Sequence, residues 1–489
     1  MKKMTTKICM AALVLASAVA ATSCSDWLDV KPYDKISEGE LLSSEEGYQK
    51  LLNGIYIDLN TDALYGKTLG VEMVEVMGGA YSIGSDKAIW GDYQELANAD
   101  YTSDTWRQRL STTWNKAYAL ILNCNKILEN IDDQRGLFSG SDYYIIKGEA
   151  LALRAMLHFD MLRLFGPVYS KDSQKTAIPY YTRQTNTPES TQTASEVADH
   201  VKADLTEALD YLGNDPIRTE GTMMSSDANG DNFLRYRALR LNYYAVEALM
   251  ARVSLYTGDK TEALRYAREV ITAASGGTFP FVDRNLVIGS PADPDRIFSS
   301  EVIFALSHAT RNQLFQNFYD PTRQGNNFVF TMDKSLLSNV IYGGAGNTGG
   351  YQDDYRYRAC WKATGSNNYF YKYSDMVNTG SIENTMIPMI RLGEMYLIAA
   401  ECAGSSLNDG VAYVNALRRN RGVASLTTLT EPLLKYEYIR ELYGEGQLFY
   451  LYKRLYCPII SSATDSKNTP ASDKVFVVPL PDSETDYTK

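Results

Sequence analysis

Histidine, the side chain most often used for zinc binding and proton transfer, occurs only 3 times in the 489 residues. His158, His200 and His308 lie far apart in the sequence, and none belongs to an H-E-x-x-H motif or a close pair. No G-x-S-x-G motif of the esterase type occurs either. The sequence therefore gives no support for a zinc or serine hydrolase, and we expect His158, within a helical stretch, to be a packed core residue.

A glycine motif and an acidic motif resemble known ligand loops without completing either. Residues 344–349 spell G-x-G-x-x-G, but they follow no convincing strand and precede no helix that could hold a pyrophosphate. We expect a flexible surface loop there. Asp227, Asn229 and Asp231 alternate like calcium ligands, yet the glycine and the final acidic residue of an EF-hand are misplaced. No cofactor is therefore predicted, although a looser structural calcium site stays open.

The cysteines show no metal-ligand spacing. Cys9 falls in the N-terminal segment, and four cysteines beyond residue 24 could form two disulfides in three alternative pairings. A chain this long does not need disulfides to stabilise its fold, and two of the four cysteines lie on apolar helix faces. We therefore expect buried free thiols. The four are Cys124, Cys360, Cys402 and Cys457, and the two on helix faces are Cys124 and Cys402.

The N-terminus has the order of a bacterial lipoprotein signal. Three lysines precede an apolar stretch from residue 8 to residue 20, which is too short to span a bilayer. The small residues 21–23 then lead to Cys24, as in a lipobox, although that pattern usually has Leu where Ala21 stands. We expect cleavage before Cys24 and lipidation of Cys24, with a simple secretory leader as the alternative.

Charge and aromatic content narrow the classes of partner. Acidic residues exceed basic ones, 59 against 48, so the formal net charge is −11 and no nucleic-acid partner is expected. Tyrosine is unusually frequent, with 36 Tyr against 15 Phe, and each Tyr ring combines an apolar face with a polar tip. Such rings suit packed helices and sugar-stacking surfaces alike.

Apolar residues recur at helical spacing over most of the chain, which predicts a mostly α protein. Gly166 and Pro167 end one helix, Ser195 is expected to cap another, and a polar linker is expected at 213–236. The expected helices are 44–59, 114–128, 151–165, 195–212, 387–403, 409–421 and 431–445, with a further pair near 243–271 and short strands at 302–305 and 475–478.

An internal repeat predicts how the helices pack. Ala251, Ala263 and Ala267 fall at offsets of 12 and 4 within a helix–turn–helix segment, and the same offsets recur at 400, 412 and 416. Small residues at these positions let paired helices approach closely, as in tetratricopeptide repeats.

Two blocks, 60–105 and 276–385, interrupt the helical pattern with Gly, Asp, Asn and Tyr. The second is too long for a plain loop, so it is expected to be a ligand-facing subdomain. The expected division is a signal peptide at 1–23, an anchor and tether at 24–43, a first helical part at 44–275, the irregular insertion at 276–385 and a C-terminal helical part at 386–489.

Several separated motifs resemble the SusD/RagB family, in the same order along the chain. One departure is that Gln447, Phe449 and Tyr450 stand where the family commonly has Arg, an aromatic residue and Asp. The matching motifs are SDWLDV at 25–30, W-x3-Y-x2-I-x3-N-x2-L at 114–128, GEA…RA…F…FG at 148–166, P-x-x-R-x-x-E-x-Y-L-x-x-A-E at 388–401, NALR…RG at 415–422, REL…EG at 440–446 and P-x-P…E at 479–484.

The charged residues of these motifs lie beside apolar helix positions, where partly buried ion pairs would fix the register of stacked helices. We expect this structural role and not catalysis, because the sequence places no acid and base in a common cleft. Asn125 is expected to bond a neighbouring loop. The charged residues are Arg154, Arg391, Glu394, Glu401, Arg440 and Glu445.

The resemblance implies a mostly α fold, in which a tetratricopeptide-like helix-pair scaffold carries an irregular, loop-rich, ligand-facing half. It also implies a lipid-anchored protein of the outer membrane, facing the exterior, that captures oligosaccharides for a SusC-type TonB-dependent transporter and is not an enzyme. RagB-like capture of peptides is the alternative. A surface glycosidase and a scaffold that binds only proteins are weaker ones.

The family motifs fix no ligand contacts, so candidates follow from chemistry. Sugar binding requires aromatic faces for C–H patches and a few polar groups for hydroxyls. Simple packing competes with ligand binding as the role of each candidate. The candidates are Tyr81, Asp86, Trp90 and Tyr93 in the first irregular block, and Tyr319, Arg323, Tyr351 and Trp361 in the second.

Overall fold

The structure is a computed structural model that describes residues 38–486, except 186, 229, 231, 290–293, 324–327, 344–350, 377–379 and 461–467. Several expectations therefore lie outside the described residues. They are lipidation of Cys24, the glycine motif at 344–349, two of the three calcium candidates and the side chain of Tyr351.

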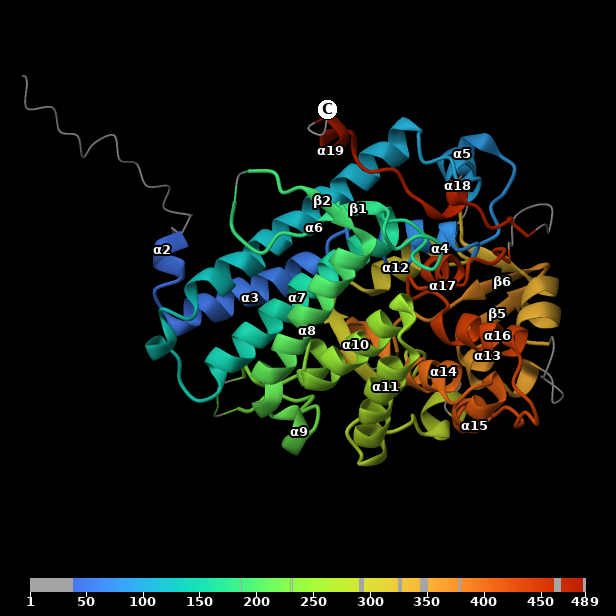
Figure 1. The fold of residues 1–489 in the computed structure, drawn as a ribbon. Helices are drawn as coiled ribbons and strands as arrows, with labels where there is room; N and C mark the ends of the chain where they lie inside the picture. Colours follow the sequence, from blue (N-terminus) through green and yellow to red (C-terminus); the bar gives the residue numbers. More distant parts are fainter. Residues whose placement is uncertain are drawn as a thin grey trace, which may run out of the picture.

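A stack of helices forms the first half of the protein, with neighbours running side by side (Figure 1). The two longest form a hairpin, as the apolar spacing of their sequences predicts. The helices are α2 (Glu38–Leu41), α3 (Glu45–Leu59), α4 (Met73–Met77), α5 (Lys87–Ala97), α6 (Asp104–Asn130), α7 (Asp142–Phe165), α8 (Ala194–Tyr211), α9 (Ile217–Glu220), α10 (Tyr243–Thr257) and α11 (Lys260–Ser275). A short hairpin of β1 (Thr176–Pro179) and β2 (Thr191–Thr193) separates α7 from α8.

Capping side chains explain where two of these helices begin. Ser44 accepts a hydrogen bond from the Gly47 N–H at 3.2 Å, so α3 begins at Glu45 as predicted. The cap of α8 is Thr193 and not Ser195 as predicted. Thr193 and Glu196 form a reciprocal capping box, a T-x-x-E pattern that outcompetes the later serine.

The second half combines short strands with further helices. Its antiparallel strands are β3 (Val302–Ser307) paired with β7 (Met386–Arg391), and β6 (Asn367–Phe370) between β4 (Thr331–Asp333) and β5 (Trp361–Thr364). Its helices are α12 (Asn312–Phe318), α13 (Tyr355–Cys360), α14 (Leu392–Cys402), α15 (Val411–Arg419), α16 (Glu431–Leu442), α17 (Leu448–Leu455), α18 (Asp473–Phe476) and α19 (Asp482–Asp486). Figure 1 shows β5, β6 and α13 to α16 together, on the opposite side from α3.

Three expectations about these elements were wrong. The helix expected at 387–403 begins only at Leu392, because residues 386–391 form β7 and pair with β3. The strand expected at 475–478 is not formed, since α18 ends at Phe476. The block at 60–105, expected to be loop-like, contains α4 and α5.

The predicted repeat is only partly realised. Helix pairs α10–α11 and α14–α15 both form, and α11 packs against α14, so the stacking of helix pairs is confirmed. Ala251, Ala263 and Ala267 are buried, as the close-approach argument requires. In the second pair Ala412 is exposed, and Gly410 makes the close approach instead, because a Cβ there would lie 1.9 Å from the Ala400 carbonyl oxygen.

One large hydrophobic cluster runs through both halves of the described chain. Strand β3 lies where the halves meet. Asn242, the cap of α10, donates to the Ile303 carbonyl at 2.9 Å, and the rings of Tyr56 and Phe304 pack edge to face with centroids 6.3 Å apart. The irregular half is therefore fixed to the helical half by a shared core and not by a linker.

Candidate functional site

The structure brings the two irregular blocks together around an aromatic cluster. The ring of Tyr81 stacks on Phe330 with centroids 4.2 Å apart, and its hydroxyl lies 2.6 Å from the hydroxyl of Tyr319. Tyr93 packs against the same Phe330 and donates to Glu72 at 2.6 Å. Backbone bonding joins the blocks as well, since the Ser82 N–H donates to the Thr331 carbonyl at 2.8 Å.

Four of the candidate rings are enclosed by this cluster, and one of them is Tyr93, which is buried against Trp106 and Phe330. Tyr81 and Tyr319 are fully buried, and Trp361 is only 5% exposed. Trp361 packs against Phe370 and Tyr443, with both centroid distances 4.8 Å. Because neighbouring rings cover these faces, we correct the interpretation of Tyr81, Tyr93, Tyr319 and Trp361, which act as core packing in this structure.

Among the candidate rings whose side chains the structure describes, Trp90 is the one that remains half-exposed. It lies 5.6 Å from the half-exposed ring of Phe328. Gly84 supports it from below, because a Cβ at Gly84 would lie 2.5 Å from the Trp90 indole nitrogen. We call Trp90, Phe328 and Arg323 the Trp90 platform. Tyr93 lies beneath it and is buried.

The polar candidates are Arg323, within the Trp90 platform, and Asp86, at the start of α5. The Arg323 guanidinium lies over the Phe328 ring at 5.5 Å, and one of its nitrogens has no hydrogen-bond partner. Asp86 is exposed and caps α5 by accepting from the Ala88 N–H at 2.9 Å. Tyr351 begins a short helix at 351–353.

Sequence reasoning missed several half-exposed groups near the predicted ones. Phe328 belongs to the Trp90 platform, while Phe315 and Tyr371 form a second half-buried pair with centroids 4.9 Å apart. The Lys362 ammonium lies 4.1 Å from the centre of the Tyr371 ring. No helical or strand periodicity distinguishes these rings from the buried ones, because both kinds occur in the same irregular segments of the sequence.

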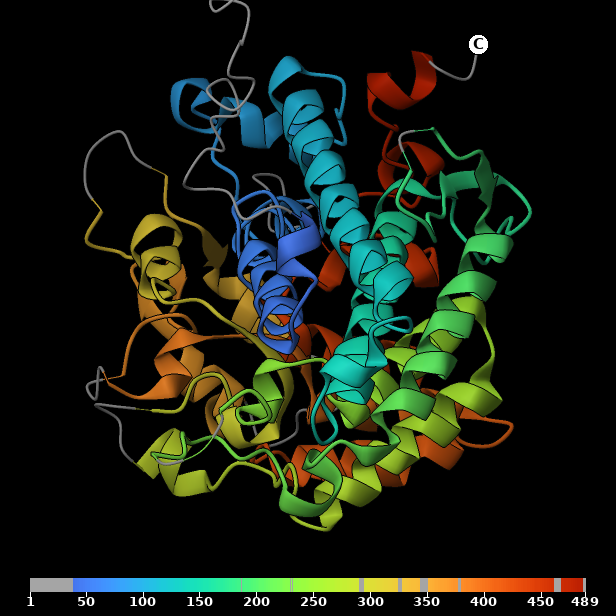
Figure 2. The ribbon, with the colours of Figure 1, turned by 90° about the vertical axis from the view of Figure 1, so that its left-hand side faces the viewer.

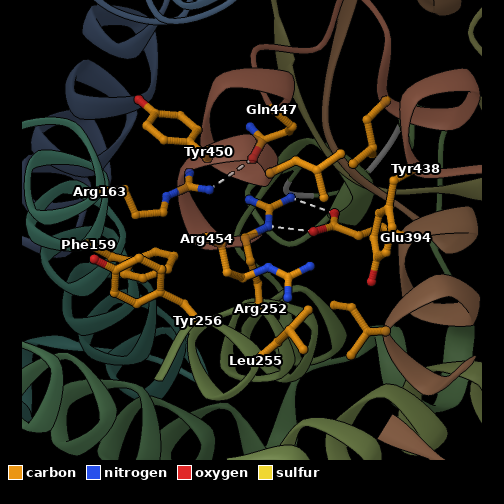
Figure 3. A pocket seen from close by; sticks show the side chains of 13 residues that line it. Phe159, Arg163, Arg252, Leu255, Tyr256, Glu394, Tyr438, Gln447, Tyr450 and Arg454 are labelled. Atoms are coloured by element: carbon orange, nitrogen blue, oxygen red, sulfur yellow. Dashed lines mark hydrogen bonds and ion pairs between the residues drawn. The ribbon is translucent and has the colours of Figure 1, made fainter. Parts of the chain in front are cut away.

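A pocket between α7, α10, α14, α16 and α17 contains three converging arginines (Figure 3). Arg252 donates two hydrogen bonds to the Glu394 carboxylate, at 2.7 and 2.6 Å. Arg454 likewise donates two hydrogen bonds to the Glu401 carboxylate. Arg163 donates to Gln447 at 3.0 Å and lies 4.1 Å from the ring of Tyr450. Arg163 also pairs with Asp160, so all three arginine charges are satisfied and the pocket joins helices. Gln447 and Tyr450 add uncharged contacts to Arg163.

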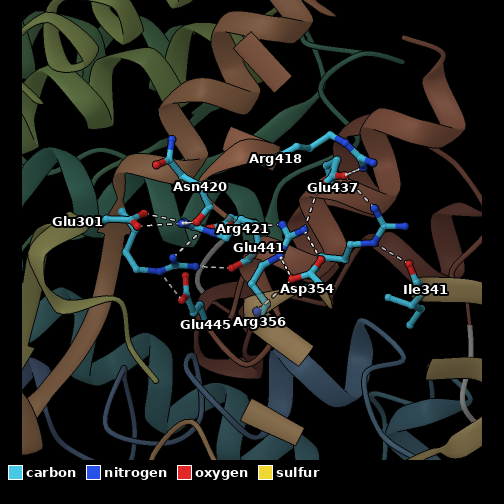
Figure 4. A network of polar contacts seen from close by, with 12 residues as sticks. Glu301, Ile341, Asp354, Arg356, Arg418, Asn420, Arg421, Glu437, Glu441 and Glu445 are labelled. Atoms are coloured by element: carbon cyan, nitrogen blue, oxygen red, sulfur yellow. Dashed lines mark hydrogen bonds and ion pairs between the residues drawn. The ribbon is translucent and has the colours of Figure 1, made fainter. Parts of the chain in front are cut away.

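A larger buried network of alternating charges joins the irregular half to α15 and α16 (Figure 4). Glu441 accepts from three guanidiniums, those of Arg356, Arg391 and Arg421, at 2.7 to 3.1 Å. Arg421 also binds Glu301, which directly precedes β3, at 2.6 Å. The predicted ion-pair role of the motif residues is confirmed here and at Arg154, which binds Asp204.

Acid should weaken the network that contains Glu437. Burial alone would raise its pKa, but Arg356, Arg440 and Arg418 lower the pKa from the ordinary 4.5 to about 2. A carboxylate with a depressed folded-state pKa stabilises the fold fully above pH 4.5, and this contribution is lost as the pH falls towards 2. In urea unfolding between pH 5 and pH 3, we expect Glu437→Gln to lose less stability than the unmodified protein. The exposed control Glu207→Gln should lose as much unfolding free energy between pH 5 and pH 3 as the unmodified protein. Equal losses in the unmodified protein and both variants would contradict the expectation.

The remaining sequence candidates have structural positions. His158 is buried, stacks on Tyr180 at 3.8 Å and accepts from the Tyr181 N–H at 3.1 Å, which confirms the packed-core prediction. Burial lowers its pKa to about 3. The thiols of Cys124 and Cys402 are free and buried, as predicted. Within the described ranges, no group of three or more His, Cys, Asp and Glu side chains is placed to hold a metal ion.

Two family models match this chain. A SusD-like family described as starch-binding and associating with the outer membrane matches residues 26–229, and the SusD family matches residues 303–478. The chain belongs to the SusD/RagB family. Its SusD-like fold is mostly α, as predicted. In the part of the chain that the structure describes, no helix is both long and apolar enough to cross a membrane.

Curated relatives match the chain only in part. SusD-like protein P38 of Formosa agariphila is 29% identical over 221 residues, which are 44% of this SusD-like chain and 38% of the relative. SusD-like protein P25 of the same organism is 26% identical over 156 residues, 30% of this chain and 29% of the relative. The match thus spans well under half the length of either relative.

Solved structures confirm the SusD-like fold over most of the chain. A SusD superfamily protein from Bacteroides thetaiotaomicron aligns with a TM-score of 0.69 and 21% identity, covering 91% of this chain and 98% of that one. A SusD-like carbohydrate binding protein from Bacteroides vulgatus aligns at 0.66 and 20%, covering 91% and 96%. A laminarin binding SusD-like protein aligns at 0.59 and 18%, covering 84% and 92%.

Proposed function

We propose that this SusD-like protein captures oligosaccharides at the Trp90 platform and delivers them to a SusC-type TonB-dependent transporter. In this proposal it is anchored to the outer membrane through a lipid on Cys24 and faces the exterior. The observation that carries the proposal is the half-exposed pair Trp90 and Phe328, with Arg323 beside it. An aromatic face with an adjacent planar donor is the chemistry that sugar C–H patches and hydroxyls require.

Two further observations support binding without catalysis. The family model that matches the N-terminal half is described as starch-binding, and two of the structural neighbours are described as carbohydrate or laminarin binding. Among the described motif residues, Glu394, Glu401 and Glu441 are each held by arginine. A carboxylate fixed in this way is a poor general acid or base. We propose no reaction for the protein.

Replacing Trp90 by Ala should weaken oligosaccharide binding by roughly 5- to 150-fold, because loss of an aromatic anchor costs about 1–3 kcal/mol. The measurement is calorimetric titration of a form that starts at Ser25 with laminarihexaose, maltohexaose, xylohexaose and mannohexaose. Tyr144→Ala removes a half-buried ring from α7 and serves as the matched control.

The titration separates the alternatives. Heat with a hexasaccharide, with an affinity that is weakened in Trp90→Ala and kept in Tyr144→Ala, supports capture at the platform. Heat only with mixed-length peptides would instead support RagB-like capture of peptides. Turnover of a bound hexasaccharide would refute a purely binding role.

A further inference from the structure

The family motif on α6 lines a cavity that the proposed function does not use. The cavity has a volume of about 220 Å³ and lies between α6, the segment after β1, and the C-terminal helix α19. Figures 1 and 2 show α19 beside α6 and close to the β1–β2 hairpin. We call it the α6 cavity. Its main lining residues are Trp114, Asn115, Tyr118, Tyr181, Arg183 and Glu484, none of which belongs to the Trp90 platform.

Buried side chains hold one wall of this cavity in place. The backbone of residues 181–183 has no regular secondary structure, yet buried side chains form hydrogen bonds with its N–H and C=O groups. Asn125 donates to the carbonyls of Tyr181 and Arg183, both at 3.1 Å. His158 accepts from the Tyr181 N–H at 3.1 Å. The predicted role of Asn125, bonding a neighbouring loop, is thereby confirmed.

A second layer fixes those side chains in turn. Arg154 donates to the Asn125 amide oxygen at 2.9 Å and to the Thr182 carbonyl at 3.3 Å. Asp204 binds the same guanidinium with two bonds of 2.7 Å. Burying these polar groups costs free energy unless all are paired, and here the pairing converges on an exposed segment. Such support is the usual requirement for a preorganised binding wall.

The floor and rim of the α6 cavity differ in chemistry. Tyr118 and Tyr181 are half-buried, with rings edge to face at 5.6 Å, and both hydroxyls are already engaged, by the Pro179 carbonyl and the Glu189 N–H. The rings offer apolar area, and the Tyr181 hydroxyl, which accepts from the Glu189 N–H, keeps its own proton to donate. At the rim Asn115 is exposed, and the Arg183 side chain is 73% exposed. Glu484 adds an acceptor from α19.

We infer that the α6 cavity binds one polyhydroxylated ring of pyranose size, as a second sugar site separate from the Trp90 platform. Its volume is below the range of about 300–1,000 Å³ that suits drug-sized ligands, so a single ring fits better than a chain. Tyrosine faces match the C–H side of such a ring, and amide, guanidinium and carboxylate groups match its hydroxyls. This inference rests on the proposed function, because it takes a glycan as the ligand.

The test fills the α6 cavity with an added side chain and leaves unchanged the residues that hold its wall in place. Asn115→Trp adds a bulky ring from an exposed position, and Ala119→Trp adds the same ring at an exposed position of α6 that does not line the cavity. Saturation-transfer NMR with the four hexasaccharides named above is measured in the Trp90→Ala background. We expect residual saturation of the sugar in Trp90→Ala, its loss on adding Asn115→Trp, and its retention on adding Ala119→Trp.

The outcomes distinguish the two proposals. No residual saturation in Trp90→Ala, or saturation that Asn115→Trp leaves unchanged, would overturn the second site while capture at the platform stands. No saturation in the unmodified protein would refute glycan capture itself. If Asn115→Trp leaves every sugar signal intact but abolishes copurification with the transporter, the cavity binds a protein partner and the inference is wrong. Equal unfolding midpoints of both Trp variants confirm that the fold is intact.

Discussion

Replacing Glu441 by Gln is expected to lower the free energy of unfolding by about 3–5 kcal/mol. Glu441 is buried and accepts from Arg356, Arg391 and Arg421, so its neutral replacement leaves three buried guanidiniums short of one negative charge. The site has no room to adjust, because Gly393 lies so close that a Cβ there would be 2.3 Å from the Glu441 carboxylate oxygen. Urea unfolding at pH 7 measures the change.

The matched control for Glu441 is an exposed ion pair. Glu262→Gln breaks the pair with Arg265, whose side chains are 41% and 48% exposed, and should cost no more than about 0.5 kcal/mol. A loss of less than 1 kcal/mol for Glu441→Gln, with sugar binding abolished, would reverse the interpretation. It would make Glu441 a functional carboxylate in place of a structural one.

Replacing Trp361 by Ala is expected to destabilise the protein by about 3–5 kcal/mol, a cost typical of removing a large buried ring. Trp361 fills the space between Phe370 and Tyr443, and the latter donates to the Ala80 carbonyl at 2.6 Å. The cavity left behind would therefore loosen contacts between both irregular blocks. The measurement is urea unfolding, combined with the hexasaccharide titration at low temperature.

Trp90→Ala is measured alongside Trp361→Ala. Because Trp90 is half-exposed, its replacement should weaken sugar binding with little loss of stability. Folded Trp361→Ala is expected to keep its affinity within about twofold, because the buried ring touches no ligand. A stable Trp361→Ala protein without affinity would contradict this and restore Trp361 as a ligand contact.

The helical half was largely predictable from the sequence, and particular residues show why. Ser44 and Gly166 mark helix ends by local chemistry, and the apolar spacing in α6 and α7 depends only on helical geometry. The same local rules misplaced the start of α14. Residues 386–391 contain helix-like apolar spacing, but their pairing with β3, far away in the sequence, makes them a strand.

The candidate site was predictable at the level of blocks and not of single residues. Aromatic content directed attention to both irregular segments, and the structure brings them into contact through Tyr81 and Tyr319. Which rings stay exposed depends on neighbours such as Phe330 and Tyr443, which only the folded chain supplies. The α6 cavity was invisible for the same reason, because α19 contributes Glu484 from the other end of the chain.

The Trp90 platform has a consequence for the order of folding. Trp90 packs against Phe328, and the ring cluster beneath them includes Tyr443. Contacts between residues so distant in sequence form late, after the chain ends have been brought together. A fragment that ends before β3 has none of Arg323, Phe328 and Tyr443, and therefore lacks the platform. Under the proposed function, such a fragment should therefore not bind glycan at the platform, even if α6 and its neighbours fold.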